Sequence, residues 1–260
     1  MNEEQQKINA HWTKGSENYD RIIHDELKSF RMEGWQRLIA EQVGSRPGLD
    51  VLDCGCGPAF FTIILSKAGY RVTGIDAAEG MLEKARKNTA EYGVDAQILE
   101  MDCHEPAFPD DSFDLVVSRN VTHALRDHVR AYSEWLRVLR PGGTLLIFDA
   151  NWHLAMSSEA WFRESMEREK KCIELYGSDF SGNTTFDEER SRRAYESERH
   201  HRLGDLRRPD WDCGLLTALG YRDITYDRDI TGPLWDDKEK LIYGHTPMFM
   251  IRARKGEAGA

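Results

Sequence analysis

A glycine-rich segment after a short apolar run is the feature that most constrains this chain. Residues 53–57 (DCGCG) follow Val51-Leu52, and Asp76 ends a second apolar run about 20 residues later, a separation typical of nucleoside sites. Glycines let the backbone fold sharply beneath a ligand, and a helix starting near Pro58 would point its first N–H groups at that ligand. The carboxylate ending the second strand can accept both hydroxyls of a ribose. The pattern therefore predicts an α/β fold that holds an adenosine-containing cofactor.

The spacing of the glycines separates two classes of such cofactors. A dinucleotide site needs Gly-x-Gly-x-x-Gly, in which the last glycine lets the helix pack closely on the strand beneath a pyrophosphate. Gly55 and Gly57 match this pattern, but Phe60 stands at the third position. Asp53 would repel a pyrophosphate and attract an ammonium group. S-adenosylmethionine carries a ribose, an ammonium group and a sulfonium but no phosphate, so the residues favour it over a dinucleotide.

Four motifs follow one another within residues 49–151: LDVLDCGCGPAFFTIIL, VTGIDAAEGML, MDCHEPAFPDDSFDLVVSRNVTHAL and WLRVLRPGGTLLIFDAN. Their order and spacing resemble those of class I S-adenosylmethionine-dependent methyltransferases of the small-molecule type. The chain departs from the family pattern at Ala59, which replaces the common third glycine, and at Pro58. Both residues stand at a predicted helix start, where proline and a small residue are tolerated. The resemblance implies S-adenosylmethionine as cofactor and S-adenosylhomocysteine as product.

Composition and charge argue against several classes of binding partner. At 260 residues the chain can bury one large core, or one core and a small cap. It has no run of 18 or more apolar residues and no signal peptide pattern, so we expect a cytoplasmic protein with no membrane partner. The five cysteines lack framework or zinc spacing, which favours reduced thiols and no metal site. The net charge of −10 argues against nucleic acid as partner, and both a monomer and a homodimer remain open.

Short apolar runs alternate with helical stretches, which predicts a Rossmann-like, doubly wound, seven-stranded and mostly parallel sheet. The expected strands are 50–54, 71–76, 96–101, 114–119, 144–149, 222–230 and 247–254, and the resemblance implies that the last two form an antiparallel hairpin. The expected helices are 59–68, 79–92, 128–139 and 210–219, and a stop and turn is expected at 140–143. We expect four segments: an N-terminal helical lid (1–45), a cofactor-binding core (46–151), an inserted cap with helices near 158–176 and 186–202 (152–208), and the completion of the sheet (209–260).

The resemblance also assigns roles to individual cofactor-site residues. It implies contacts to the methionyl part from Asp53, Cys54, Gly55 and Gly57, to the ribose from Asp76 and Ala77, and to the adenine from Met81, Asp102 and Cys103. Arg119 and Asn120 would lie near the sulfonium and the acceptor, and Tyr19, in a W-(x6)-Y-D pattern, would reach the cofactor's carboxylate. A core role for Met81, a strand-end turn at Asp102 and an aromatic helix face at Tyr19 remain open alternatives.

His123 is the candidate catalytic residue, because a neutral imidazole just past the fourth strand could remove a proton from an oxygen or nitrogen acceptor. A histidine that orders the loop or lines the pocket is the alternative. Asn151, Trp152 and His153 leave the fifth strand toward the same mouth and are candidate acceptor residues. A core-capping tryptophan with a solvated histidine would explain Trp152 and His153 equally well.

The predicted activity is direct, in-line transfer of a methyl group to a small-molecule acceptor. Such a reaction gains most from alignment and dehydration, and it needs a base only if the acceptor carries a proton. A nucleic-acid or protein methyltransferase is the first alternative. The acidic balance argues against it, as does SRNV at 118–121, which is not the Asn-Pro-Pro-aromatic motif of base-amino methylation. A non-catalytic cofactor-binding module is the second alternative.

Overall fold

The centre of the protein is a seven-stranded sheet in the order β3-β2-β1-β4-β5-β7-β6, which a computed structural model describes for residues 3–44, 46–180, 182–199, 201–204 and 206–257. Strands β1 to β5 run parallel, and β7 runs antiparallel to both β5 and β6. The predicted fold class and the C-terminal antiparallel hairpin are confirmed. The strands are β1 (Asp50–Cys54), β2 (Arg71–Asp76), β3 (Gln97–Glu100), β4 (Phe113–Arg119), β5 (Leu139–Asp149), β6 (Arg222–Asp227) and β7 (Phe249–Arg254).

Helices cover both faces of the sheet because residues along its strands alternate between two apolar clusters. Leu146 and Phe148 of β5 pack with α1, α2 and α3, whereas Leu145 and Ile147 pack with α5 and α8 on the other face. The helices around the sheet are α1 (Glu3–Leu27), α2 (Arg31–Val43), α3 (Phe60–Lys67), α4 (Glu79–Glu91), α5 (His128–Val138) and α8 (Asp210–Leu219). In the described part of the chain, no helix is long and apolar enough to cross a membrane.

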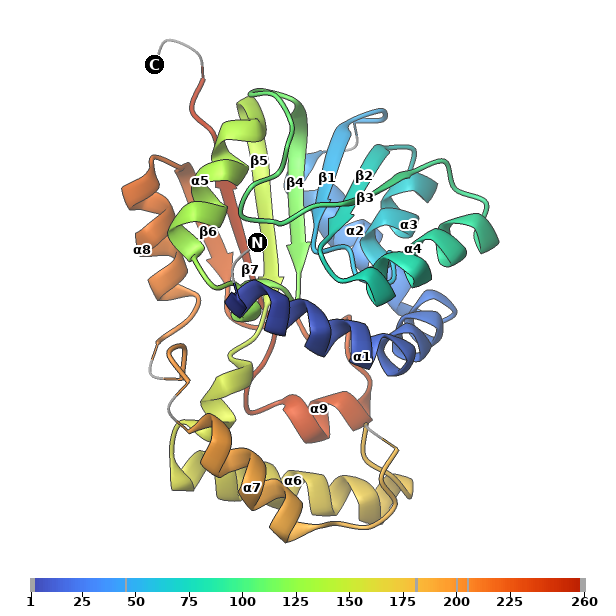
Figure 1. The fold of residues 1–260 in the computed structure, drawn as a ribbon, viewed down its shortest axis with the longest axis vertical. Helices are drawn as coiled ribbons and strands as arrows, with labels where there is room; N and C mark the ends of the chain where they lie inside the picture. The colour runs from blue at the N-terminus through green and yellow to red at the C-terminus, as the bar shows by residue number, and fades with distance from the viewer. Residues whose placement is uncertain (1–2, 45, 181, 200, 205, 258–260) are drawn as a thin grey trace.

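A further layer of helices lies beyond the carboxyl ends of the parallel strands (Figure 1). It contains α6 (Glu159–Tyr176), α7 (Glu188–Glu198) and α9 (Asp237–Tyr243), and the short 3-10 helix η2 (Trp152–Met156) leads into it from β5. Helix α1 crosses the strand ends between the sheet and this layer (Figure 1). Helix α1 and this outer layer therefore both cover the carboxyl edge of the sheet.

The main differences from the expected elements concern β5 and α9, and β3, β6, β7 and α7 are also shorter than expected. Strand β5 begins at Leu139 rather than at residue 144, because Leu139 pairs with Phe113 and the backbone of Gly142 and Gly143 bonds with Lys255. Helix α9 was not expected: it is seven residues long, too short for a periodic apolar pattern, and a capping box of Asp236 and Glu239 begins it.

Candidate functional site

The glycine-rich loop after β1 is held against β2 by its own backbone. Gly55 N and Cys56 N both donate to Ile75 O at 2.9 Å. Gly55 has a φ of +72°, and a Cβ there would lie 2.4 Å from Cγ2 of Val121. Only glycine therefore fits this position, both for its backbone conformation and for the close approach of the loop after β4.

Ala59 occupies the position of the family's common third glycine in an unfavourable conformation. It is the N-cap of α3, has a φ of +74° and is fully buried. A left-handed conformation costs about 1–2 kcal/mol for a residue with a Cβ. The loop thus holds a left-handed conformation at a residue that carries a methyl group, which glycine would lack.

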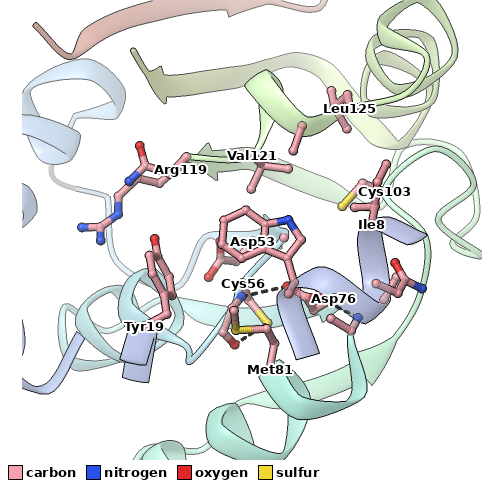
Figure 2. A pocket seen from close by; sticks show the side chains of 18 of the residues that line it. Ile8, Tyr19, Asp53, Cys56, Asp76, Met81, Cys103, Arg119, Val121 and Leu125 are labelled. Atoms are coloured by element: carbon pink, nitrogen blue, oxygen red, sulfur yellow. Dashed lines mark hydrogen bonds between the residues drawn. The ribbon is translucent and has the colours of Figure 1, made fainter. Parts of the chain in front are cut away.

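A cavity opens at this loop. Figure 2 shows Asp53, Cys56 and Asp76 on one side of it, with Arg119 and Val121 from the end of β4 across from them. Of the predicted cofactor residues, the following line it: Tyr19, Asp53, Gly55, Gly57, Asp76, Ala77, Met81, Asp102, Cys103, Arg119 and Asn120. Cys54 is the exception among them, because its side chain is fully buried in the apolar cluster beneath α5.

Two carboxylates stand at the carboxyl ends of β1 and β2, beside the loop. Asp53 is 2% exposed and accepts a hydrogen bond of 2.7 Å from Thr62 Oγ1, and burial raises its pKa to about 6. Asp76 accepts from Gly57 N at 3.0 Å and from Ala78 N at 2.9 Å, and burial raises its pKa as well. A cationic or hydroxyl-bearing ligand would relieve part of the cost of keeping both groups ionised.

Asp102 lines the cavity but is already paired within the protein. Its carboxylate accepts from His104 N at 2.9 Å and lies 2.6 Å from His104 Nδ1 and 2.7 Å from the Arg126 guanidinium. Burial acts to raise the pKa of Asp102, but His104 and Arg126 outweigh it and hold that pKa well below its usual range. Arg126 also donates to Gln5 of α1, so this pair joins the loop after β3 to α1.

Arg119 and Asn120 end β4 with polar atoms that face the cavity region without partners. The Arg119 side chain is 7% exposed and pairs with Glu26 of α1 at 2.6 Å. Burial lowers the pKa of Arg119, but Glu26 and Tyr19 more than offset it. Arg119 Nη1 and Asn120 Oδ1 are buried and make no hydrogen bond to any residue that the structure describes. Asn120 also has a φ of +55°, a strained backbone of the kind that clusters at functional sites.

His123 belongs to the 3-10 helix η1 (Thr122–Ala124) and lies beside the cavity rather than in its lining. Its Nδ1 lies 3.0 Å from Oδ1 of Asp149, the last residue of β5. Its ring contacts Trp12, which does line the cavity, with 6.4 Å between ring centroids. The imidazole therefore packs against Trp12 in the wall of the cavity.

In the part of the chain that the structure describes, the three candidate acceptor residues are also not among those that line the cavity. Trp152 Nε1 donates to Asp149 Oδ1 at 2.9 Å, and Asn151 Nδ2 donates to Arg208 O at 3.3 Å. The rings of Trp152 and His153 lie 6.4 and 6.1 Å from the ring of His123. All three therefore gather on the side of His123 that faces the outer helical layer.

Sequence reasoning missed two parts of this site. The first is the start of α1, before the predicted W-(x6)-Y-D pattern, where Gln5, Ile8 and Asn9 line the cavity. The second is Asp149, which a sequence signal could have found, because it ends an apolar strand as Asp53 and Asp76 do. Among the described residues, no group of three or more His, Cys, Asp or Glu could hold a metal ion.

Comparison with known proteins agrees with this geometry. The family described as "Methyltransferase domain" matches residues 52–147. Demethylmenaquinone methyltransferase of Staphylococcus aureus is 34% identical over 140 residues, which cover 52% of this chain and 57% of that protein. The chain thus matches these curated relatives over little more than half of their length.

Solved structures share the fold at low sequence identity. A putative S-adenosyl-L-methionine-dependent methyltransferase from Methanococcus maripaludis superposes with a TM-score of 0.58 at 20% identity, over 95% of each chain. Phosphoethanolamine N-methyltransferase 2 from Haemonchus contortus, solved with S-adenosyl-L-methionine, gives a TM-score of 0.59 at 17% identity, over 85% of this chain and 52% of that one. The fold is the Rossmann-like fold that these methyltransferases share. Residues 52–147 of this chain are similar in sequence to the methyltransferase domain family.

Proposed function

We propose that this protein binds S-adenosylmethionine in the cavity and transfers its methyl group to a small-molecule acceptor. The observation that carries the proposal is the pair of carboxylates, the buried Asp53 and the half-buried Asp76, at the two strand ends that flank the loop. Bound S-adenosylmethionine supplies an electrophilic methyl group on a cationic sulfur. The named relatives support a small acceptor, because the curated one acts on demethylmenaquinone and one structural neighbour on phosphoethanolamine.

The polar atoms of the cavity fit the cofactor's functional groups. Asp76 would accept the ribose hydroxyls, and the loop backbone with Asp53 would face the ammonium group. Met81 and Cys103 would border the adenine, on which Asp102 would accept the amino group. The unpartnered Arg119 Nη1, with Tyr19 beside it, suits the carboxylate better than the sulfonium, because two cations repel. Asn120 Oδ1 would accept a hydrogen bond from the ammonium group.

The outer helical layer would then form the acceptor side. Tyr243 of α9 contacts both Trp152 and Phe180, with ring centroids 5.5 and 5.2 Å apart. These rings connect the expected cap segment, 152–208, with α9 and with the surroundings of His123. We therefore propose that the cap comprises that segment together with α9, that α1 is the lid, and that Asn151, Trp152 and His153 shape the acceptor site.

Calorimetric titration with S-adenosylhomocysteine, with NADH as the control ligand, tests the proposal. We expect micromolar binding of the first ligand and none of the second. Binding of NADH alone would overturn the cofactor assignment. Binding without turnover of S-adenosylmethionine on any acceptor in a broad screen would favour a non-catalytic binding module.

Replacing Asp76 with Ala should weaken S-adenosylhomocysteine binding by about 1–3 kcal/mol, the cost of losing hydrogen bonds to a charged acceptor. Asp95→Ala is the matched control, because it removes the same charge from an exposed turn before β3. Equal affinities of the two variants would contradict the ribose assignment.

A further inference from the structure

We propose that His123 and Asp149 form a general-base pair and that the acceptor is an aromatic hydroxyl compound. This inference rests on the proposed function and adds to it the class of acceptor and a positioning residue, Asp149. The observations that carry it are the hydrogen-bonding of Asp149, the tautomer that this bonding imposes on His123, and the rings around the imidazole.

Asp149 is a fully buried carboxylate with a donor at nearly every lone pair. Its Oδ2 accepts from Thr122 Oγ1 at 2.6 Å and from His123 N at 2.8 Å. Its Oδ1 accepts from Ala150 N at 2.8 Å and from Trp152 Nε1 at 2.9 Å, and it lies 3.0 Å from His123 Nδ1. The orientation of the carboxylate is therefore fixed.

This carboxylate stays ionised. Burial acts to raise the pKa of Asp149, but His123 and Arg208, whose Nη1 lies 3.5 Å away, together hold it well below its usual range. An ionised Asp149 carries no proton to share, so the proton between the two groups belongs to His123 Nδ1. In a neutral imidazole the other nitrogen, Nε2, is then a hydrogen-bond acceptor.

Aromatic rings from two helices contact His123. Trp12 belongs to α1, where it also contacts His11, and Trp152 and His153 belong to η2. The His153 ring stacks on His201, and its Nδ1 lies 3.7 Å from the Glu198 carboxylate of α7. Two further charged groups lie near His123: Asp149, which is its partner, and Arg208, which lies beside Asp149.

Two indole rings, from Trp12 and Trp152, flank the imidazole, each with 6.4 Å between ring centroids. Trp12 also lines the cofactor cavity, so an acceptor packed on this indole would lie next to the cofactor. Flat aromatic compounds pack well on an indole ring, where offset and edge contacts stabilise them. A base next to such a site is useful for a hydroxyl, which is protonated at neutral pH, and superfluous for a thiolate.

Atoms and charge balance in the proposed transfer of the methyl group. The acceptor's O–H proton passes to Nε2 of His123 and its bonding pair stays on oxygen. The oxygen forms a bond to the methyl carbon as the carbon–sulfur bond breaks, and that pair goes to sulfur. The positive charge thus moves from sulfur to the imidazole, where Asp149 stabilises it until the proton is released to water.

The first experiment uses ¹⁵N-histidine NMR on the free protein, with His123→Asn to assign the signal. We expect neutral His123 to carry its proton on Nδ1 and to lose that preference in Asp149→Asn. A proton on Nε2 in the wild-type protein would overturn the base assignment. Because Asp149→Asn disturbs a buried ion pair, circular dichroism checks its fold, and Thr122→Val, which removes one donor to Asp149, serves as the milder variant.

The second experiment adds 4-nitrophenol to the protein saturated with S-adenosylhomocysteine, at a mildly acidic pH where the free probe is mostly protonated. We expect the bound probe to absorb as the phenolate in the wild type and in His201→Asn, and about 100-fold less in His123→Asn or His123→Gln, within the usual range for loss of a base. No binding of the probe, or equal phenolate in all variants, would overturn the inference. Failure to bind S-adenosylhomocysteine would instead count against the proposed function, and the NMR result on the free protein would still decide the base pair.

Discussion

At the residue scale, Asp53 should make the affinity for the cofactor depend on pH. Its pKa in the free protein is raised to about 6 by burial, so the side chain is protonated below that pH and ionised above it. Only the ionised form attracts the cofactor's ammonium group. We therefore expect the affinity for S-adenosylhomocysteine to fall as the pH falls through about 6, by at most about tenfold per pH unit. Calorimetry at a series of pH values measures this, and Asp53→Asn should flatten the profile; parallel profiles would refute the role of Asp53.

Ala59 offers a second test at this scale. Replacing it with Gly removes the Cβ from a left-handed conformation, which is worth about 1–2 kcal/mol, against an entropy cost of about 0.5–1 kcal/mol. We expect Ala59→Gly to raise the free energy of unfolding by up to about 1 kcal/mol in urea denaturation. The control is Ala68→Gly, at a right-handed C-cap, which should lower it instead. A loss of stability in both variants would mean that Ala59 is not strained.

Individual residues were predictable where they stand at strand ends. Asp53, Asp76 and Arg119 reach the cavity because the carboxyl ends of parallel strands meet at one edge, and the sequence shows where each strand ends. The hydrogen-bond partners of Asp149 in η1 and the ion pair of Asp102 with Arg126 were not predictable, because these contacts join segments far apart in sequence. The spacing of the motifs does not indicate which charged side chains form ion pairs with one another.

At the scale of elements, the packing of α1 on α4 depends on Gly80. A Cβ there would lie 2.9 Å from the backbone oxygen of Thr13 and 2.9 Å from Ser16 Oγ. We expect Gly80→Ala to push α1 away and to cost about 1–3 kcal/mol of stability, as overpacking does. Amide hydrogen exchange should also become faster in α1.

Gly15 provides the matched control within α1 itself. Among the described residues nothing lies within 4 Å of a Cβ built there, so Gly15→Ala should stabilise the helix by about 0.5–1 kcal/mol. If both alanine variants behaved alike, the contact of α1 with α4 at Gly80 would not matter for stability.

Elements were predictable in proportion to their length and burial. The bounds of β1, β2 and α8 agree with the expected 50–54, 71–76 and 210–219, because each is a compact apolar or periodic segment with clear stop signals. Helix α9 escaped prediction because its seven residues depend on a capping box and on packing against α6. The early start of β5 depends on pairing with β4 and so is a tertiary effect.

At the scale of the whole molecule, Arg208 joins three parts of the chain. Its side chain is 1% exposed, pairs with Asp212 of α8 at 2.8 Å, lies 3.5 Å from Asp149 of β5 and donates to Thr122 of η1. Removing it leaves two buried carboxylates without their cation. We expect Arg208→Met to lower the free energy of unfolding by about 3–5 kcal/mol.

The comparison variant is Arg228→Met, which breaks an ion pair to Asp210 on the surface, where both side chains are about half exposed. This change should cost no more than about 1 kcal/mol. Denaturant titration of both variants measures the difference. Similar losses of unfolding free energy in the two variants would show that the buried ion pairs of Arg208 contribute no more to stability than an exposed pair.

Helix α1 spans the cavity from one end to the other, contributing Gln5 near one end of the helix and Ile23 near the other to its lining. It is tied to the domain beneath by Asp20 with Asn88, Glu17 with Lys84 and Glu26 with Arg119. The proposed lid role of α1 requires these ties to open before a ligand reaches the glycine-rich loop. In a stopped-flow experiment the observed rate of cofactor association should therefore level off with concentration, at the opening rate of α1, instead of rising linearly as it would for an uncovered site.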